Sequence, residues 1–365
     1  MLEKEKIIKG LKSDNEYLYN YIFEYVSMYR LYDDKEINKE LIECINKNYN
    51  DLPIYMLKYN TLNKEIIEAL IKLHESINND KIKSSIEIVL LHNYNLLKEM
   101  DYNYNSLFVD REDRLNNLIY RRIKHFEKKD EDFINELYDD LYVKYLSDNY
   151  TNVDKAFTNA LNIVSTLDEK RHENAVILYN QYMENILEDI KDLEQDCINF
   201  FLLPLLMYKD DSYVKEMLDL YITIIKEYQI VDLMDEFFYY FSNVEDEEFY
   251  TYFIEKYNEN KYMYELLDLA SYIKSEKIDE VLINSYKNSK NQEEKNEILN
   301  VLAGRFNKEC LSYAKDYIRN IECDLYSINS FEPIVCLLLL EEPDEEITKE
   351  AIKKIEDHNR NLVHI

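Results

Sequence analysis

Glycine occurs at only two of the 365 positions, Gly10 and Gly304, and proline occurs at four. A chain of this length that contains sheets needs many tight turns with a positive φ, and glycine adopts that conformation most readily. Short connections between helices can instead be built from Asn, Asp, Ser and Lys. The scarcity of glycine therefore predicts an all-α fold.

The spacing of apolar residues predicts the same fold class. They recur at helical intervals along nearly the whole chain, and no stretch sustains the alternation typical of a strand. Ser/Thr-x-x-Glu patterns predict capping boxes that begin at Ser13, Thr166 and Ser242, and Asn291 begins a related pattern. These patterns predict roughly twenty helices of about 10–20 residues, joined by short polar turns.

Residues 17–32, YLYNYIFEYVSMYRLY, carry six tyrosines in sixteen positions. On a helix five of them gather along one flank of a broad apolar arc that Leu18, Ile22, Phe23 and Val26 continue; the five are Tyr17, Tyr21, Tyr25, Tyr29 and Tyr32. The segment is either an aromatic binding surface or part of the core. The breadth of the arc favours core packing, as does a composition rich in residues with A/T-rich codons. Each buried hydroxyl then needs a hydrogen-bond partner.

Short similar strings recur along the chain. They are INKELIECI (37–45), LNKEIIEAL (62–70) and ITKEAIKKI (347–355), with IDEVLINSY (278–286) as a looser relative. A recurring helix that cannot bury its apolar face alone is typical of a solenoid, in which each unit stacks on its neighbours.

The clearest unit lies between residues 275 and 320, where IDEVLINSYKNS, QEEKNEILNVLAG and KECLSYAKDYIR follow one another. This segment resembles the HEAT-repeat family, whose second helix often opens with an acidic-x-basic turn and ends in Leu-Gly. The matching residues are Glu294, Lys295, Ile298, Leu299, Leu302, Ala303 and Gly304. Lys295 stands where the family usually has arginine, and a proline of the first helix is missing. The resemblance implies a right-handed α-solenoid of antiparallel helix pairs; an irregular all-α bundle is the alternative.

The stretch DYNYNSLFVD (101–110) interrupts the helical pattern. It predicts a boundary between an N-terminal helical array over residues 1–105 and a HEAT-like array over residues 106–365. One continuous solenoid is the alternative.

The net charge of −30 limits the classes of partner that the chain can bind. Such a charge repels nucleic acid and anionic membranes, so we expect neither, and it favours a basic protein partner. Two glycines so far apart exclude a P-loop, a dinucleotide fingerprint and a nucleophile elbow, and no cofactor is expected. The charged N-terminus lacks the apolar core of a signal peptide, and the longest apolar runs are too short to span a bilayer. We therefore expect a cytoplasmic protein.

Cysteine and histidine patterns predict no catalytic or metal-binding residues. The five cysteines form no C-x-x-C pair, and Cys310, Cys323 and Cys336 follow at intervals of thirteen, as buried packing positions on stacked helices would. The six histidines lack the spacing of a zincin site. Glu169-x-x-His172 is a single carboxylate–imidazole pair, which we interpret as a surface contact.

Two charged features are candidate partner-binding sites. On one predicted helix an arc of basic residues lies beside an apolar face of Leu115, Ile119, Ile123 and Phe126; the basic residues are Arg111, Arg114, Arg121, Arg122, His125, Lys128 and Lys129. This arc suits an anion or an acidic partner. The second feature is acidic density in 139–149, in 341–346 and in 244–249, where Glu245, Asp246, Glu247 and Glu248 are consecutive. The alternative for both is a solvated helix surface.

These patterns favour a non-catalytic α-solenoid that binds another macromolecule. A concrete version is a cytoplasmic immunity or inhibitor protein that neutralises a basic toxin or nuclease through an acidic surface. The alternative is an all-α enzyme whose clustered carboxylates hold a divalent metal. A peptide-binding regulatory solenoid ranks third, because the period of about 34 residues that marks tetratricopeptide repeats is missing. The oligomeric state is not predicted.

Overall fold

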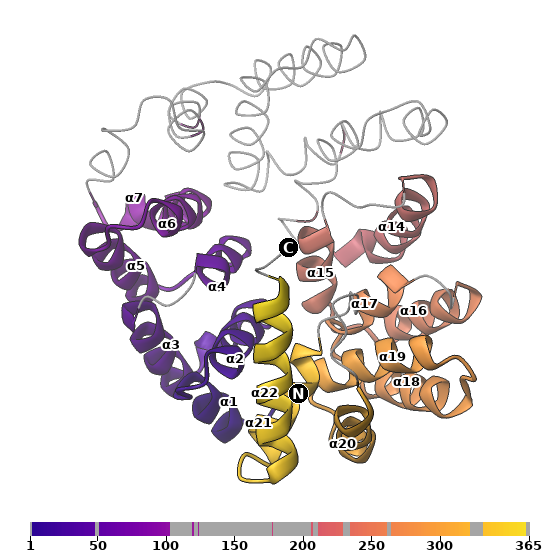
Figure 1. Cartoon of the computed structure of the whole chain (residues 1–365). Helices are drawn as coiled ribbons and strands as arrows, with labels where there is room; N and C mark the ends of the chain where they lie inside the picture. The colour runs from indigo at the N-terminus through magenta and orange to yellow at the C-terminus, as the bar shows by residue number, and fades with distance from the viewer. Residues whose placement is uncertain are drawn as a thin grey trace. The chain divides into compact units, whose positions relative to one another are not determined.

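The structure is a computed structural model of the chain. It describes residues 2–47, 51–102, 211–228, 234–260, 264–321 and 331–362, with the single positions Ile119, Ile123, Ile177 and Leu206. Within these ranges all regular secondary structure is helical, and no residue lies in a strand (Figure 1). The prediction of an all-α fold is confirmed for the described part of the chain.

Sixteen α-helices lie in the described ranges. The first seven are α1 (Lys4–Leu11), α2 (Glu16–Met28), α3 (Lys35–Lys47), α4 (Asp51–Met56), α5 (Lys64–Ser76), α6 (Asp80–His92) and α7 (Tyr94–Glu99). The others are α14 (Val214–Tyr228), α15 (Met234–Ser242), α16 (Glu247–Glu259), α17 (Tyr264–Ala270), α18 (Glu276–Asn288), α19 (Gln292–Gly304), α20 (Leu311–Asn320), α21 (Glu332–Glu341) and α22 (Glu346–Leu362). Among them, none combines the length and the hydropathy that a membrane span requires.

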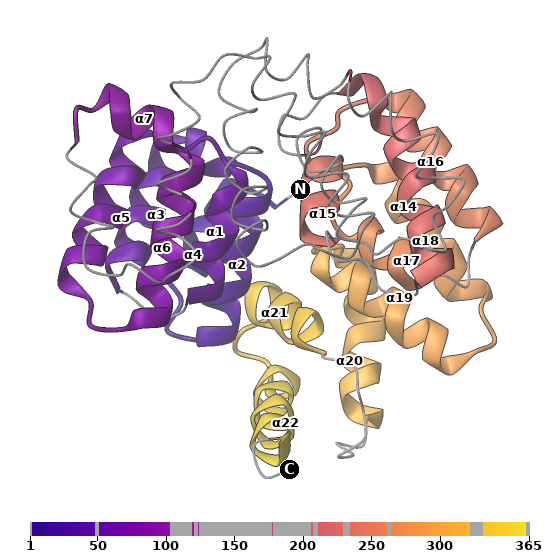
Figure 2. The same ribbon diagram turned by 90° about the horizontal axis from the view of Figure 1, so that it is seen from above.

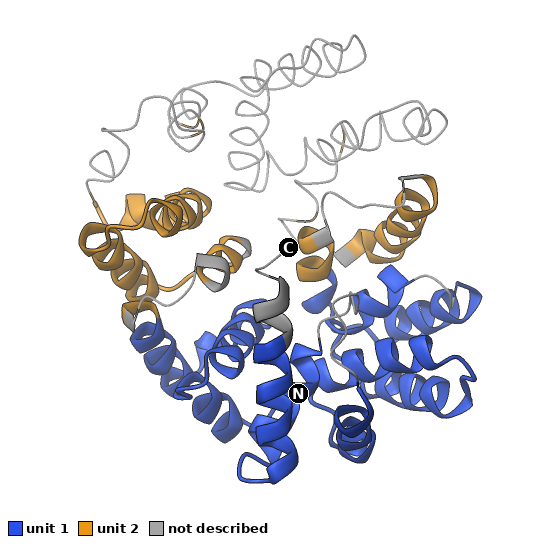
Figure 3. Cartoon of the chain, viewed as in Figure 1, with its two compact units in different colours: residues 1–44, 241–365 blue, residues 45–240 orange. Residues whose placement is uncertain are grey.

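The chain divides into two compact units, which Figure 3 shows in different colours. Unit 1 consists of residues 1–44 and 241–365, and unit 2 consists of residues 45–240. The divisions fall inside α3 and α15. The boundary predicted after residue 105 lies outside the described residues.

Asparagine begins several of these helices. The side chains of Asn15, Asn63, Asn79 and Asn291 each accept a hydrogen bond from a backbone N–H of the first turn. The N-cap predicted at Asn291 is therefore confirmed. The return bond of a capping box is replaced by a relay, because the N–H of Asn291 donates to the Ser289 hydroxyl and that hydroxyl donates to Glu294 at 2.6 Å.

The capping boxes predicted at Ser13 and Ser242 are wrong. Helix α2 begins two residues later than expected, because the carboxamide of Asn15 reaches the N–H of Leu18 at 3.2 Å and supplies the cap itself. Ser242 is the buried last residue of α15, and its hydroxyl donates to the carbonyl oxygen of Met28 at 3.3 Å. Thr166 lies outside the described residues.

The three similar strings lie in α3, α5 and α22, and they bury equivalent positions. The fifth and ninth residues of each string are at most 3% exposed: Leu41 and Ile45, Ile66 and Leu70, Ala351 and Ile355. Their place in the helix differs, since Asn63 caps α5, whereas Asn38 and Thr348 lie inside α3 and α22. The strings therefore share an apolar face and not a common helix start.

The C-terminal helices of unit 1 pack in two rows. Helix α16 contacts α18, and α20 contacts α22; in the other row α17 contacts α19, and α19 contacts α21. Consecutive helices α18 and α19, α20 and α21, and α21 and α22 also contact one another. The rings of Tyr286 and Tyr313, 4.6 Å apart, connect α18 with α20. Figure 2 shows α16 and α18 side by side.

Three tyrosines of α2 and its C-cap pack in the core of unit 1. Tyr19, Tyr25 and the C-cap Tyr29 are at most 8% exposed, whereas Tyr17 and Tyr21 are half-buried. Their hydroxyls are satisfied: Tyr19 donates to Cys44 O at 3.2 Å, Tyr29 donates to Ser271 O at 3.0 Å, and Tyr25 accepts from Leu2 N at 3.1 Å. Core packing is therefore confirmed for this helix.

Both glycines lie where two helices touch, and neither has a positive φ. A Cβ at Gly10 in α1 would lie 3.1 Å from both Cβ and Cγ2 of Ile22 in α2, and closer still to Cγ1. A Cβ at Gly304 would lie 2.6 Å from the hydroxyl oxygen of Tyr21. Close approach of helices, rather than turn formation, therefore explains both glycines.

Buried polar groups in unit 2 meet one another. His74 Nε2 lies 3.0 Å from Glu87 Oε1, and Glu87 is 1% exposed. Lys58 Nζ lies 3.4 Å from Glu236 and 4.0 Å from the centre of the Tyr55 ring. Burial, with a smaller contribution from Lys58, lowers the pKa of His92 to about 3, so this histidine is neutral at physiological pH.

Candidate partner-binding site

The acidic segment predicted at residues 245–248 forms the start of α16. Asp246 is the N-cap, and its Oδ1 accepts from the N–H of Glu248 at 2.9 Å. Glu247 pairs with Lys277 at the start of α18. Glu245 and Glu248 are exposed. Asp246 therefore serves the helix and Glu247 its neighbour, and three of the four acids, Glu245, Glu247 and Glu248, are exposed.

The second acidic stretch, 341–346, is partly used inside unit 1. Glu341 pairs with Lys6 and lies 3.9 Å from Lys308, and Glu342 pairs with Lys315 at 2.5 Å. The following acids, Asp344 to Glu346, are exposed. The third stretch, 139–149, lies outside the described residues.

The predicted basic arc also lies outside the described residues, namely Arg111, Arg114, Arg121, Arg122, His125, Lys128 and Lys129. Two positions of the apolar face beside it are described. Ile119 and Ile123 are 1% and 0% exposed, as that face requires.

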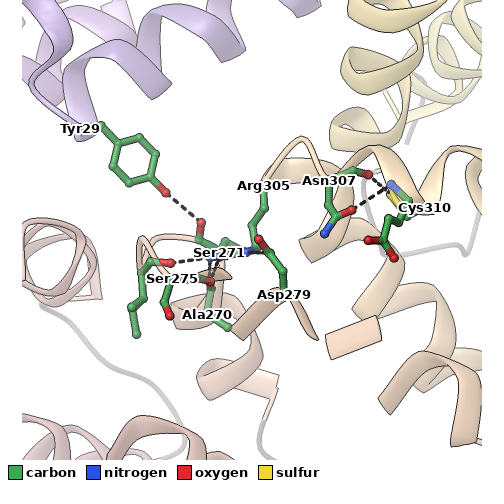
Figure 4. Close-up of polar contacts among 10 residues, drawn as sticks. Tyr29, Ala270, Ser271, Ser275, Asp279, Arg305, Asn307 and Cys310 are labelled. Atoms are coloured by element: carbon green, nitrogen blue, oxygen red, sulfur yellow. Dashed lines mark hydrogen bonds and ion pairs between the residues drawn. The ribbon is translucent and has the colours of Figure 1, made fainter. Parts of the chain in front are cut away.

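Arg305 directly follows α19. Its side chain binds the loop that connects α17 with α18 (Figure 4). Its Nη1 donates to the carbonyl oxygens of Ala270 and Ile273 at 2.5 and 2.6 Å, and its Nη2 donates to that of Ser275 at 2.8 Å. Its Nε donates to Asp279 Oδ1 at 2.5 Å. The guanidinium thus neutralises a carboxylate, satisfies the carbonyl of Ala270 at the C-terminus of α17 and binds two carbonyls of the following loop. Its side chain is only 7% exposed.

The end of α19 aims Arg305 at this loop. The N–H of Asn307 donates to Leu302 O at 3.0 Å and that of Phe306 donates to Ala303 O at 2.9 Å, which is the Schellman pattern. Phe306 occupies the left-handed position with φ 55°, where glycine is the usual residue. Its ring packs edge-on against Tyr21 and Tyr25 at 5.8 and 5.6 Å, which holds this strained backbone in place.

A pocket of about 210 Å³ opens beside Arg305. Tyr25 of α2 and the C-cap residue Tyr29 form one side, and residues 273–276 form another. Lys274 Nζ lies 4.9 Å from the centre of the Tyr29 ring. Burial lowers the pKa of Lys274, while the nearby carboxylate of Glu245 opposes that fall.

This pocket offers little unused charge to a ligand. Four of the five N–H groups of Arg305 are committed to the protein. Asp279 neutralises the guanidinium, and Lys274 lies over an aromatic ring. The arrangement therefore fixes the loop beside the acidic segment, and we interpret it as the support of a surface rather than as a catalytic centre.

The described residues contain no group of three His, Cys, Asp or Glu that could hold a metal ion. Cys310 and Cys336 are fully buried and free, as their predicted packing role requires; Cys323 and Glu169-x-x-His172 lie outside the described residues. Burial raises the pKa of Cys310 to about 12 and also raises that of Cys336, so neither is a thiolate at neutral pH.

Carboxylates of α17 and α19 give a testable pH dependence. Burial, with Glu265, raises the pKa of Asp268 to about 6; burial, with Asp268 and Glu293, raises that of Glu297, whose buried Oε1 has no hydrogen-bond partner among the described residues. The folded chain thus binds protons more tightly than the unfolded chain between about pH 4 and 6, so these groups add stability as the pH falls.

We expect Asp268→Asn/Glu297→Gln to be more stable than the wild type at pH 7, by less than about 1 kcal/mol because solvent reaches Asp268. The difference should shrink by pH 5. Urea unfolding of both proteins at the two pH values measures it. A difference that grows on acidification would contradict the assigned direction.

The sequence interpretation missed Arg305. Its neighbours Leu302, Ala303 and Gly304 were recognised as a helix end, and an arginine directly after such an end is well placed to reach carbonyls of a preceding loop. Which loop it reaches depends on tertiary packing.

Comparison of the chain with protein-family models gives no match, and comparison with curated proteins gives none either.

Proposed function

We propose that the protein is a non-catalytic binding protein that holds a basic protein partner on unit 1, at the acidic start of α16. We further propose that its scaffold is a HEAT-like α-solenoid of antiparallel helix pairs. The concrete version is an immunity or inhibitor protein that neutralises a basic toxin or nuclease.

The packing of unit 1 supports the solenoid proposal. In one row α16 contacts α18 and α20 contacts α22, with α18 and α20 joined by the rings of Tyr286 and Tyr313; in the other, α19 contacts both α17 and α21. The starts of α16 and α18 meet through Glu247 and Lys277, and their ends meet through the hydrogen bond between Tyr257 and Ser285, so these two helices are parallel. Parallel helices within a row are what stacked helix pairs produce.

The residues that resemble a HEAT repeat also have the burial expected of an inner helix. On α19, Ile298, Leu299, Leu302 and Ala303 are at most 1% exposed. Gly304 lets α19 approach Tyr21 of α2 closely. The Leu-Gly ending therefore serves packing here, while Phe306 supplies the left-handed residue of the cap.

The acidic start of α16 carries the functional proposal. Glu245, Glu247 and Glu248 are exposed side chains at the start of one helix that Asp246 caps, on a chain with a net charge of −30. The hydrogen bonds of Arg305 fix the loop over residues 270–275, and this loop flanks the acidic start of α16. A fixed acidic surface steers a basic partner and favours it over acidic ones.

Charge reversal at this surface tests the proposal. We expect Glu245→Lys/Glu248→Lys to lose a basic protein that the wild-type chain captures from native lysate at near-stoichiometric amounts. The same partner should dissociate from the wild type as salt rises from 50 to 500 mM, because exposed charges are screened. Parallel captures compared by mass spectrometry give the measurement.

A matched variant, Glu65→Lys/Glu99→Lys, reverses two exposed acids of unit 2 and makes the same change in net charge. It should retain the partner. Equal loss with both variants would indicate a general effect of net charge, and retention by Glu245→Lys/Glu248→Lys would contradict the proposed surface.

A further inference from the structure

A polar groove of about 630 Å³ lies along the last turns of α16 and α18 and the first turn of α19. Neutral side chains that both donate and accept hydrogen bonds dominate its lining. They are Asn258 from α16, Asn284, Ser285 and Asn288 from α18, and Ser289 and Asn291 from the connection to α19.

Three of these carboxamides are uncommitted. Asn258, Asn284 and Asn288 are exposed, and their side-chain amides make no hydrogen bond to any other described residue. The remaining groups hold the groove together: Ser285 bonds to the Tyr257 hydroxyl, Ser289 to Glu294, and Asn291 to the N–H of Glu293 at 2.9 Å. The floor of the groove is therefore fixed, and its free amides face solvent.

We propose that this amide groove binds the main chain of an extended segment of the basic partner, an inference that rests on the proposed function. A carboxamide offers one donor group and one acceptor, which match the C=O and N–H of a peptide unit. Such contacts recognise the backbone whatever the side chains are, so the amides contribute affinity while the acidic segment selects for basic residues.

The spacing of the free amides suits a strand. Asn284 and Asn288 are one helical turn apart, which is a rise of about 6 Å. Alternate residues of an extended chain, whose N–H and C=O groups face the same side, repeat every 6.4–6.8 Å, roughly the same interval. Two successive amides of α18 can therefore pair with residues i and i+2 of one strand.

The acidic segment lies at the other end of the same two helices. From Lys277, which meets Glu247, to Asn288 the rise along α18 is about 17 Å. An extended chain covers that distance in about five residues. A segment of about nine residues thus spans the groove and the acidic segment together.

Other ligands fit the groove less well. Sugar sites usually present the face of an aromatic ring, but Tyr257 is only 5% exposed. A small anion would find one lysine, Lys290, beside the carboxylate of Glu294.

The test uses the full chain and a fluorescein-labelled nonapeptide of alternating Lys and Ala, titrated at low salt by fluorescence anisotropy. We expect Asn284→Ala/Asn288→Ala to weaken binding about tenfold or more, because several main-chain hydrogen bonds are lost. Methylation of the backbone nitrogens of the five central residues should weaken wild-type binding similarly, and it should have little further effect on the double variant.

Gln292→Ala/Asn296→Ala is the matched control. It removes two amides at the same spacing on α19 that bond to each other at 2.9 Å and lie outside the groove lining. It should bind the nonapeptide as the wild type does. Unchanged binding by Asn284→Ala/Asn288→Ala, or equal binding of the methylated and unmethylated peptides, would overturn the inference. If Glu245→Gln/Glu248→Gln still weakened binding in that case, the acidic surface of the proposed function would stand without the amide groove.

Absence of wild-type binding to the unmethylated nonapeptide would also overturn the groove inference. The capture of a basic protein through Glu245 and Glu248 would then still decide the proposed function separately.

Discussion

Replacement of Arg305 by methionine is expected to lower the free energy of unfolding by about 3–5 kcal/mol. Methionine has similar length and packs well in an apolar site, but it donates no hydrogen bonds. The carbonyls of Ala270, Ile273 and Ser275 would lose a charged donor, and among the described residues only that of Ile273 has another, the N–H of Ser275. Asp279, whose side chain is 25% exposed, would be left partly desolvated without its counter-charge, which is costly.

Urea unfolding followed by far-UV circular dichroism measures this loss. Arg319→Met is the control, because Arg319 forms an exposed pair with Asp316 at 2.8 Å and should change stability by less than about 0.5 kcal/mol. Arg305→Lys should remain strongly destabilised, since one ammonium cannot reach four acceptors arranged around a planar fork. Equal stability of Arg305→Lys and the wild type would show that charge alone, without the fork, fixes the loop.

Gly10→Ala is expected to destabilise the chain by about 2 kcal/mol, although alanine is the better helix former by about 1 kcal/mol. The added methyl would collide with Ile22, which is fully buried and stiff because it branches at Cβ. Helices α1 and α2 would have to separate. A double-mutant cycle with Ile22→Ala isolates the collision, and the double variant should be more stable than the sum of the single changes by at least about 1 kcal/mol.

Gly304→Ala provides the contrasting case. The new methyl meets only the hydroxyl oxygen of Tyr21, so the combination with Tyr21→Phe should relieve most of the cost. Purely additive changes in both cycles would mean that the glycines are not needed for close helix approach.

The all-α class could be predicted because both of its indicators, the scarcity of glycine and the helical spacing of apolar residues, are visible in the sequence. The buried faces of α3, α5 and α22 could also be predicted, since helical spacing fixes which residues share a face. The residues at which helices begin were harder to predict. Ser13 and Asn15 both suit a cap, and only the geometry of the first turn decides between them.

The candidate sites also combine features that are visible in the sequence with features that depend on tertiary packing. The acidic segment at 245–248 stands out in the sequence, but the pairing of Glu247 with Lys277, thirty residues away, depends on tertiary packing. Arg305 has no distinctive local pattern, because its partners lie 26–35 residues earlier in the chain. The amides of the groove are common surface residues, and only the parallel alignment of α16 and α18 brings Asn258 beside Asn284 and Asn288.

Together these features assign separate roles to one surface of unit 1. The Schellman end of α19 aims Arg305, Arg305 fixes the loop between α17 and α18, and that loop flanks the exposed acids of α16. A surface held in place before binding loses less conformational freedom on association, which favours affinity.

Hydrogen–deuterium exchange of the full chain, with and without a saturating amount of the Lys/Ala nonapeptide, tests this account most directly. The account predicts added protection in residues 245–260 and 276–291, which carry the acidic segment and the amide groove. Protection elsewhere in the chain without any in these two segments would contradict it.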